Sequence, residues 1–289
     1  MLRSIAMPIP DARRAGTLYL VPVPIGNPDD LTIRGRDTLK SVAVVAAEDT
    51  RHFATLARHH RIEARAVSYH DHNEDARSRE LVERLRSGDD VALVSDAGTP
   101  LVSDPGYRLV RAAIDAGIAV ASLPGASAVT TALAASGLPP HPFRFIGFLP
   151  RASAARRAAL DHLRDEEATL VAFETPRRLL AALRDAHGAL GDRAACLARN
   201  LTKRHERYQR GPLSALIGEL EAEGDVRGEC TLLIGGATGR PEATAEAEAD
   251  ARLLVDGGAP ARAVQELLVA RHGLARREAY ALVLRLRRE

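Results

Sequence analysis

The 289-residue sequence contains no tryptophan, two cysteines and 3% aromatic residues. The cysteines, Cys196 and Cys230, lack the spacing of a metal or redox motif, so a disulfide framework is not expected. Lysine is almost absent, because Lys40 and Lys203 are the two lysines among 40 basic residues. A bias this strong reflects overall composition, and a single arginine therefore carries little information about function.

Long apolar runs are also missing, and a membrane-spanning helix needs about 20 apolar residues in succession. Residues 116–140 are the longest weakly apolar stretch, and Pro124-Gly125 interrupts them. Residues 1–15 lack the apolar segment of a secretory signal and are predicted to be a disordered lead-in. We therefore expect a soluble, cytoplasmic protein without a membrane partner. Its net charge of +2 means that any nucleic-acid-binding surface must be local.

Short β-branched runs alternate with amphipathic segments, which is typical of βαβ units around a mainly parallel sheet. A proline-rich segment, residues 138–142, interrupts this pattern, because proline continues neither a helix nor a central strand. The sequence predicts an α/β fold with two α/β domains, residues 16–138 and 143–237. The predicted strands are Leu18–Val23, Val42–Ala47, Ala66–Tyr69, Val91–Val94, Ile118–Ser122, Phe145–Leu149, Thr169–Phe173, Ala194–Ala198 and Thr231–Ile234.

The C-terminal part differs in composition from the two domains. Residues 238–249 are rich in Ala, Glu, Pro and Thr and are predicted to be a linker. Residues 250–289 are predicted to form a small helical appendage, in which the segment from residue 259 onward has seven arginines and three glutamates. Two interpretations stay open: a helical bundle with a solvated basic face, or an appendage in which Arg276 and Arg277 contact RNA phosphates.

Three loops that follow predicted strands form the candidate site, because doubly wound sheets bind ligands beyond the carboxyl ends of their strands. Residues 22–32 form a stiff loop that lacks the glycine patterns of dinucleotide-binding and P-loop proteins. Residues 95–106 combine two glycines, two prolines, two aspartates and three hydroxyls, so a ligand can approach a preorganised backbone. Residues 123–128 place a glycine and a hydroxyl at a helix start, where N–H groups are free.

Two further loops carry acidic side chains. Glu48-Asp49-Thr50-Arg51 follows the second strand, and we favour a functional role over a helix cap, because buried carboxylates are costly. His70-Asp71-His72 follows the third strand and has groups that can ligate a divalent ion. Asn73 or Asp75 is well placed to cap the next helix, so a substrate-contacting loop is favoured and no metal is expected.

Together these loops resemble the tetrapyrrole methylase superfamily over roughly residues 16–236. The stretches 48–51 and 95–106 resemble, more narrowly, the enzymes that methylate the 2′-hydroxyl of a cytidine in the decoding centre of 16S ribosomal RNA. The resemblance implies an S-adenosylmethionine-dependent methyltransferase, a homodimer, a cofactor cleft between the two domains, and 16S ribosomal RNA within the small ribosomal subunit as partner. In the second domain it rests on Phe173–Leu179, Ala198–Lys203 and Gly228–Cys230.

The matching motifs also imply roles for individual residues. Methyl transfer to a hydroxyl requires that the hydroxyl is held close to the methyl carbon and that its proton is removed. For the reacting end we predict Glu48, Asp49, Arg51 and Lys203, with Asp96, Asp104 and Glu174 as alternative bases. The implied cofactor contacts are Pro24, Asp96, Ala97, Gly98, Thr99, Ser127, Phe173, Glu174, Cys230 and Thr231.

A local run of basic residues suggests how an RNA would be held. Arg199, Arg204, Arg207 and Arg210 lie close together in the sequence and are predicted to contact phosphates. Two other functions stay open. A precorrin-type carbon methyltransferase would have the same fold, although the basic run argues against a small pigment. A non-catalytic RNA-binding assembly factor would have lost the cofactor.

Overall fold

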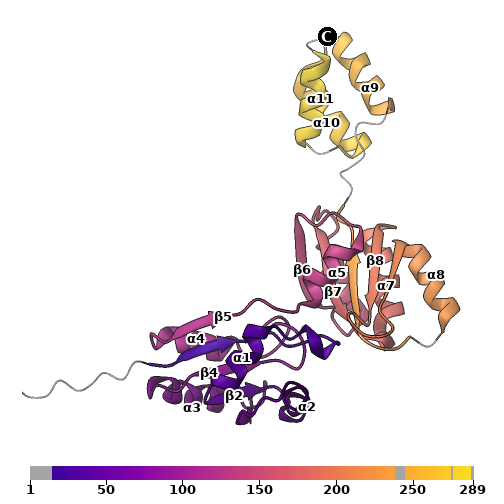
Figure 1. Cartoon of the computed structure of the whole chain (residues 1–289). Coiled ribbons are helices and arrows are strands. Elements are labelled where there is room, and N and C mark those ends of the chain that lie inside the picture. Colours follow the sequence, from indigo (N-terminus) through magenta and orange to yellow (C-terminus); the bar gives the residue numbers. More distant parts are fainter. Residues whose placement is uncertain (1–14, 225, 238–244, 275, 288–289) are drawn as a thin grey trace, which may run out of the picture.

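The computed structural model describes residues 15–224, 226–237, 245–274 and 276–287. These residues form two α/β domains and a helical C-terminal unit (Figure 1). Apart from Ala15, the predicted lead-in lies outside the described residues, as do residues 238–244 of the predicted linker. Among the described helices, none is long and apolar enough to cross a membrane. The nine predicted strands are confirmed, with shifts of a few residues at their ends.

In residues 15–123 the first domain forms a parallel sheet with the strand order β3-β2-β4-β1-β5. Its central strands β2 and β4 are apolar and fully buried, as expected for a sheet covered on both faces. The strands are β1 (Thr17–Leu20), β2 (Val44–Ala47), β3 (Ala66–Ser68), β4 (Val91–Val94) and β5 (Ala119–Ser122), and the helices are η1 (Pro28–Asp30), α1 (Ile33–Ser41), α2 (Thr50–His60), α3 (Glu74–Arg86) and α4 (Tyr107–Asp115).

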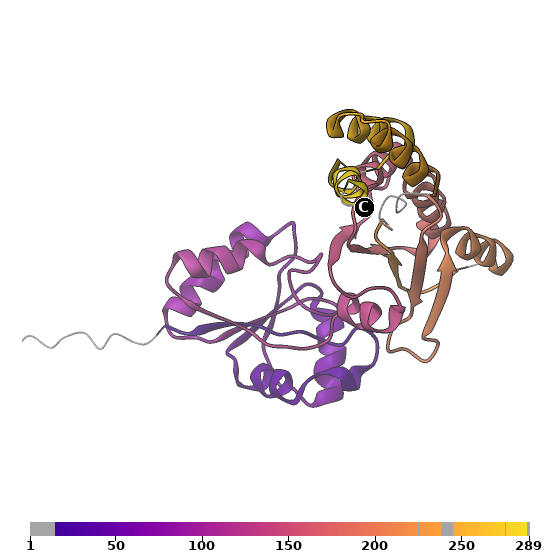
Figure 2. The ribbon, with the colours of Figure 1, turned by 90° about the horizontal axis from the view of Figure 1, so that it is seen from above.

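The second domain, as far as it is described, has a mixed sheet with the order β6-β7-β10-β8-β9. Strands β6 and β7 are parallel, and the other neighbours are antiparallel. Figure 2 shows the two domains side by side, each with its own sheet. The strands are β6 (Phe143–Phe148), β7 (Thr169–Glu174), β8 (Ala194–Arg199), β9 (Arg207–Pro212) and β10 (Cys230–Ile234), and the helices are α5 (Ala128–Ser136), α6 (Ser153–Asp161), α7 (Pro176–Leu190) and α8 (Leu213–Glu223).

Helix α5 precedes the proline-rich segment, yet it packs on the second sheet. Its residues Val129 and Leu133 share a buried core with Val171 of β7 and Leu233 of β10. Arg210 of β9 donates hydrogen bonds to the carbonyl groups at the C-terminal end of α5. In packing terms the chain therefore passes to the second domain before α5, and the boundary predicted at the prolines lies too far toward the C-terminus.

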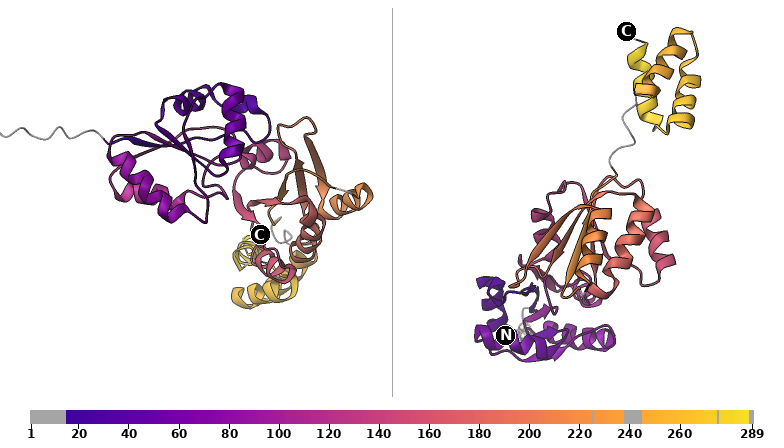
Figure 3. Two further views of the ribbon diagram at one scale, coloured as in Figure 1. Left: turned by 90° about the horizontal axis from the view of Figure 1, so that it is seen from below. Right: turned by 90° about the vertical axis from the view of Figure 1, so that its right-hand side faces the viewer.

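Residues 245–274 and 276–287 form the helices α9 (Ala245–Asp256), α10 (Ala261–His272) and α11 (Arg276–Leu286). Figure 3 shows these helices beside one another. Ala251, Leu268 and Val283 belong to their shared buried core. Because α9 begins at residue 245, the last five residues of the predicted linker are helical, and that prediction is wrong for them.

Candidate functional site

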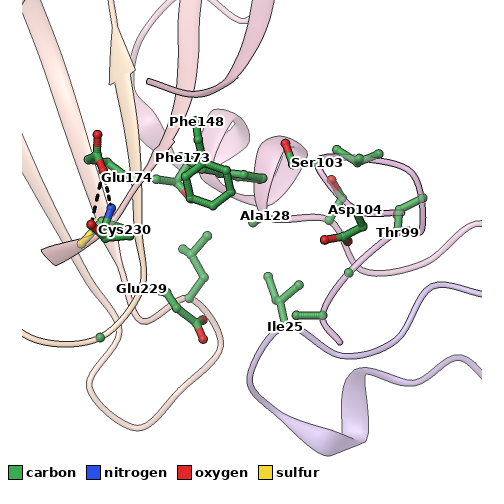
Figure 4. A pocket seen from close by; sticks show the side chains of 18 of the residues that line it. Ile25, Thr99, Ser103, Asp104, Ala128, Phe148, Phe173, Glu174, Glu229 and Cys230 are labelled. Carbon is green, nitrogen blue, oxygen red and sulfur yellow. Dashed lines mark hydrogen bonds between the residues drawn. The ribbon is translucent and has the colours of Figure 1, made fainter. Parts of the chain in front are cut away.

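A cavity of about 300 Å³ lies between the two domains, at the carboxyl ends of the first domain's strands (Figure 4). Thr99 and Asp104 lie on its first-domain side, and Phe173 and Cys230 lie on the other side. The structure brings together eight of the ten predicted cofactor contacts, although they come from distant parts of the sequence. These eight are Ala97, Gly98, Thr99, Ser127, Phe173, Glu174, Cys230 and Thr231.

The first-domain wall of this cavity is the loop at residues 95–106. The backbone of Gly98 exchanges two 2.9 Å hydrogen bonds with Val23, and the Thr99 hydroxyl donates a 3.1 Å bond to the carbonyl group of Ala126. Leu101 and Ser103 adopt left-handed backbone conformations with φ of 71° and 69°. Such conformations cost on the order of 1–3 kcal/mol each and cluster at functional sites. The loop is thus held in shape by its neighbours.

The second-domain wall is mainly apolar. Phe173 makes edge-on contacts with Phe145 and Phe148, at centroid distances of 4.9 and 5.6 Å. Burial raises the pKa of the Cys230 thiol to about 11, so this side chain acts as a small apolar group and not as a nucleophile. This wall suits a flat, apolar part of a ligand.

Glu174 lines the same cavity, but its carboxylate is already bonded to neighbouring residues. Its carboxylate accepts a 2.7 Å hydrogen bond from the Thr175 amide and pairs with Arg178 at 3.0 Å. The residue is 2% exposed. Glu174 therefore anchors the start of α7, and this geometry argues against its predicted alternative role as a free base.

The Asp104 carboxyl group, in the loop at residues 95–106, faces the cavity from the first domain (Figure 4). Burial raises its pKa to about 7, and the charges of Glu48, Asp96 and Asp71 add to this effect, while a hydrogen bond from Ser95 opposes it. Burial also raises the pKa of Glu48, again with help from Asp96. In the part of the chain that the structure describes, no group of these side chains has the arrangement of a metal site.

The four residues predicted at the reacting end do not line one common cavity. The Glu48 carboxylate accepts a 3.4 Å hydrogen bond from the Asp96 amide and lines neither of the two cavities described here. Asp49 caps α2 through the Arg51 amide at 2.8 Å and pairs with the Arg51 guanidinium at 2.7 Å, which holds the pKa of Asp49 well below its usual range. Arg51 has a side chain that is 90% exposed. The helix-cap interpretation of this stretch therefore applies to Asp49 and Arg51.

A second cavity of about 330 Å³ adjoins the first and shares Ile25, Ala97 and Glu229 with it. It contains Lys203 and the two remaining predicted cofactor residues, Pro24 and Asp96. The Lys203 ammonium pairs with the Glu229 carboxylate at 2.8 Å.

Helix α2 contributes His52, Leu56 and His59 to this second cavity, and sequence reasoning missed these side chains. Their spacing of three to four residues places them on one face of the helix, which was the available signal.

The predicted RNA-contacting arginines of the second domain are in different environments. Arg199 is 6% exposed and pairs with Glu223 at 2.8 Å, so the prediction that it contacts RNA is corrected. Arg207 is exposed and pairs with the same carboxylate, and Arg210 binds the end of α5. Arg204 is exposed, and among the described residues its side chain has no hydrogen-bond or ion-pair partner.

In the C-terminal unit several basic side chains are paired with acids. Arg271 pairs with Asp250 at 3.1 Å, and Arg285 pairs with Glu248 at 2.9 Å. Arg276 begins α11 and is exposed, whereas the side chain of Arg277 lies outside the described part of the structure. The two interpretations of this unit therefore both stay open.

The sequence matches the profile of the family Tetrapyrrole (Corrin/Porphyrin) Methylases over residues 17–217. It is 54% identical over 278 residues to Ribosomal RNA small subunit methyltransferase I of Micromonospora olivasterospora, covering 94% of this chain and 88% of that protein. It is 43% identical over 265 residues to the protein of the same name from Streptococcus pyogenes serotype M1, covering 90% and 92%.

The fold is similar to that of uroporphyrin-III C-methyl transferase from Thermus thermophilus complexed with S-adenyl homocysteine. The TM-score is 0.54 at 20% identity, and the match covers 76% of this chain and 97% of that one. This likeness concerns the fold alone. The family match covers more than half of the chain and contains most residues of the interdomain cavity. The chain therefore belongs to the tetrapyrrole methylase family and is a methyltransferase.

Proposed function

We propose that the protein methylates the 2′-hydroxyl of a cytidine in the 16S ribosomal RNA of the small subunit, in the decoding centre. The match to ribosomal RNA methyltransferases over 94% of the chain supports this substrate, because that match includes C-terminal helices beyond the methylase family profile. The observation that carries the proposal is a preformed cavity between the domains that fits a cationic methyl donor. That donor is S-adenosylmethionine.

The cavity fits this donor in both shape and charge. Ile25, Val102 and Phe173 provide apolar surfaces for a flat adenine ring. Among the described residues that line it, the charged side chains are the carboxylates Asp104, Glu174 and Glu229, of which Glu174 already pairs with Arg178 and Glu229 with Lys203. S-adenosylmethionine supplies a methyl group on a positively charged sulfur, and carboxylates favour a ligand of that charge.

Asp104, which lines the first cavity, is our candidate for the group that takes the proton of the acceptor hydroxyl. It faces the cavity and has a pKa of about 7, so part of the population is ionised near neutral pH. The loop at residues 95–106 holds it in place, and a fixed position of donor and acceptor groups supplies much of the acceleration of a methyl transfer. Lys203 lines the second cavity, which shares Ala97 with the first, and it can stabilise negative charge on the acceptor.

The test is the transfer of tritiated methyl groups to small ribosomal subunits that lack the modification. We expect label in 16S ribosomal RNA and a stop at one cytidine when primer extension is run at low nucleotide concentration. Label on a uroporphyrinogen or precorrin but not on small subunits would show that the carbon-methylase alternative is correct. Absence of S-adenosylmethionine binding by calorimetry would favour the non-catalytic assembly factor.

The proposal includes a cytoplasmic homodimer, as the resemblance implies. Tyr107 and Ile114 of α4 are large apolar side chains that are mostly exposed, and they are candidates for burial in an interface. Sedimentation velocity of the purified protein checks the oligomeric state.

A further inference from the structure

The second cavity adjoins the cofactor cavity, and its lining contains basic side chains as well as the carboxylates Asp96 and Glu229. From this arrangement we infer that it binds the acceptor nucleotide of the RNA, an inference that rests on the proposed function. The basic side chains that line it are His52 and His59 of α2 and Lys203 of the second domain. Among the described residues that line the first cavity there is no basic side chain. A phosphodiester carries negative charge, so it can be contacted by basic side chains of the second cavity, whereas the described lining of the first cavity offers it none.

The shared wall explains how an acceptor in one cavity meets the donor in the other. Ile25, Ala97 and Glu229 contribute to both cavities. Ala97 presents a single methyl group, so it takes up little space where the two cavities adjoin. A ribose beside Ala97 lies where the two cavities adjoin, so its hydroxyl can meet a methyl group held in the first cavity with nothing between them, as an in-line transfer requires.

The α2 side of the second cavity is held rigidly against the first loop. His59 contacts the Asp29 carboxylate at 3.1 Å, and the ring of His60 donates a 2.8 Å hydrogen bond to the carbonyl group of Pro28. His52 is exposed, and within the described residues its ring has no hydrogen-bond or ion-pair partner. Its ring is therefore available for a phosphate or for stacking on a base.

A basic track continues outward from this cavity. Arg204 and His205 directly follow Lys203, are exposed, and have no side-chain partners among the described residues. An RNA strand has phosphates on both sides of the acceptor nucleotide, so it can contact Lys203 and this track together. A small tetrapyrrole carries carboxylates too, but it has no strand that extends beyond the cavity.

The experiment places a large side chain in the second cavity without entering the first. Leu56 lines the second cavity but not the first. Ala54 is an exposed residue of the same helix that lines neither cavity. For Leu56→Trp we expect unchanged affinity for S-adenosylmethionine by calorimetry and at least a tenfold loss of kcat/KM for small ribosomal subunits. Ala54→Trp is the matched control and should retain wild-type values. Equal activity of Leu56→Trp and wild type would overturn the inference.

A crosslinking measurement separates failure of this inference from failure of the proposed function. The photoreactive residue benzoylphenylalanine is introduced at position 56, or at position 54 as the control, and each protein is irradiated with small subunits and S-adenosylhomocysteine. Crosslinks to 16S ribosomal RNA from position 56 in clear excess over position 54 support the site even if no methyl group is transferred. Equal or absent crosslinks from position 56 would overturn the inference, including the case in which Leu56→Trp is inactive because it folds poorly.

Discussion

A β-carbon at Gly26 would stand 2.6 Å from Cγ of Lys203 and 2.7 Å from the carbonyl oxygen of Leu201. Gly26 belongs to the first loop and Lys203 to the second domain, so the two domains are in close contact at a residue that has no side chain. The Asn27 amide donates a 2.9 Å hydrogen bond to the Thr202 hydroxyl beside this contact. The contact therefore sets the distance between the domains at the edge of the second cavity.

We expect Gly26→Ala to lower kcat/KM for small subunits by about tenfold or more, because the added carbon must displace Lys203 and the backbone of Leu201. Steady-state kinetics with S-adenosylmethionine and small subunits measure the loss. Gly188→Ala in α7 is the control, since a β-carbon there meets nothing within 4 Å. That control should be neutral or stabilising by up to about 1 kcal/mol. Wild-type kinetics of Gly26→Ala would contradict the role given to this contact.

Lys203→Ala should lose turnover while it keeps the affinity for S-adenosylmethionine within about threefold. The reason is that Lys203 lines the second cavity and not the first. Its ion pair with Glu229 is partly exposed, so its loss should change the free energy of unfolding by less than about 1 kcal/mol. Calorimetry and single-turnover methylation separate the two effects, and Lys40→Ala on the exposed side of α1 is the control. Equal losses of binding and turnover would place Lys203 at the cofactor.

Asp104→Asn should raise the melting temperature more at pH 8 than at pH 5. Because the pKa of Asp104 is raised to about 7, the folded protein holds a proton that the unfolded chain releases near pH 4. Stability from this group therefore falls as the pH rises from about 4 to 7, and above pH 7 the ionised carboxylate destabilises the fold fully. Asparagine cannot ionise, so the variant does not lose stability at this position as the pH rises. Scanning calorimetry at both pH values tests the sign, and a larger gain at pH 5 would refute it.

The same substitution should act on the cofactor in the opposite direction. At pH 8 the ionised Asp104 attracts a cationic donor, so Asp104→Asn should weaken binding of S-adenosylmethionine at pH 8 and less so at pH 5.5. Asp37→Asn is a suitable control, because this exposed residue lines neither cavity. Pure structural damage would instead weaken binding equally at both pH values.

How much of the candidate cofactor site could be predicted from the sequence depends on whether position along the chain was enough or the direction of the side chain was also needed. Ala97, Gly98 and Thr99 could be located because they follow an apolar strand of a doubly wound sheet, where ligands bind. Asp49 and Arg51 could not be assigned in the same way. Their side chains turn toward each other at the start of α2, and adjacent carboxylates in a sequence do not show which one faces the ligand.

Two features of the fold escaped prediction for physical reasons. Strand β9 carries the exposed side chains of Arg207 and Arg210, so its sequence resembles a charged run, and its buried Gln209 gives no apolar alternation. Helix α5 is adjacent in sequence to the first domain, and only long-range packing shows that it belongs to the second sheet. The second cavity likewise depends on long-range contacts, because Lys203 and α2 are far apart in the sequence.

Because Arg199 is buried and Arg204 is exposed, we expect substitution of Arg199 to lower stability and substitution of Arg204 to weaken RNA binding. Arg199→Ala should lower the melting temperature by several degrees, because it removes a nearly buried partner of Glu223. Arg204→Ala should leave the melting temperature unchanged and weaken binding to small subunits, with the salt dependence reduced by about one unit of slope. Filter binding at several salt concentrations, alongside thermal unfolding, separates the two. If Arg199→Ala weakened RNA binding with no change in melting temperature, the sequence-based prediction that Arg199 contacts phosphates would be correct. The contact with RNA would then not be confined to Arg204 and His205 beside Lys203.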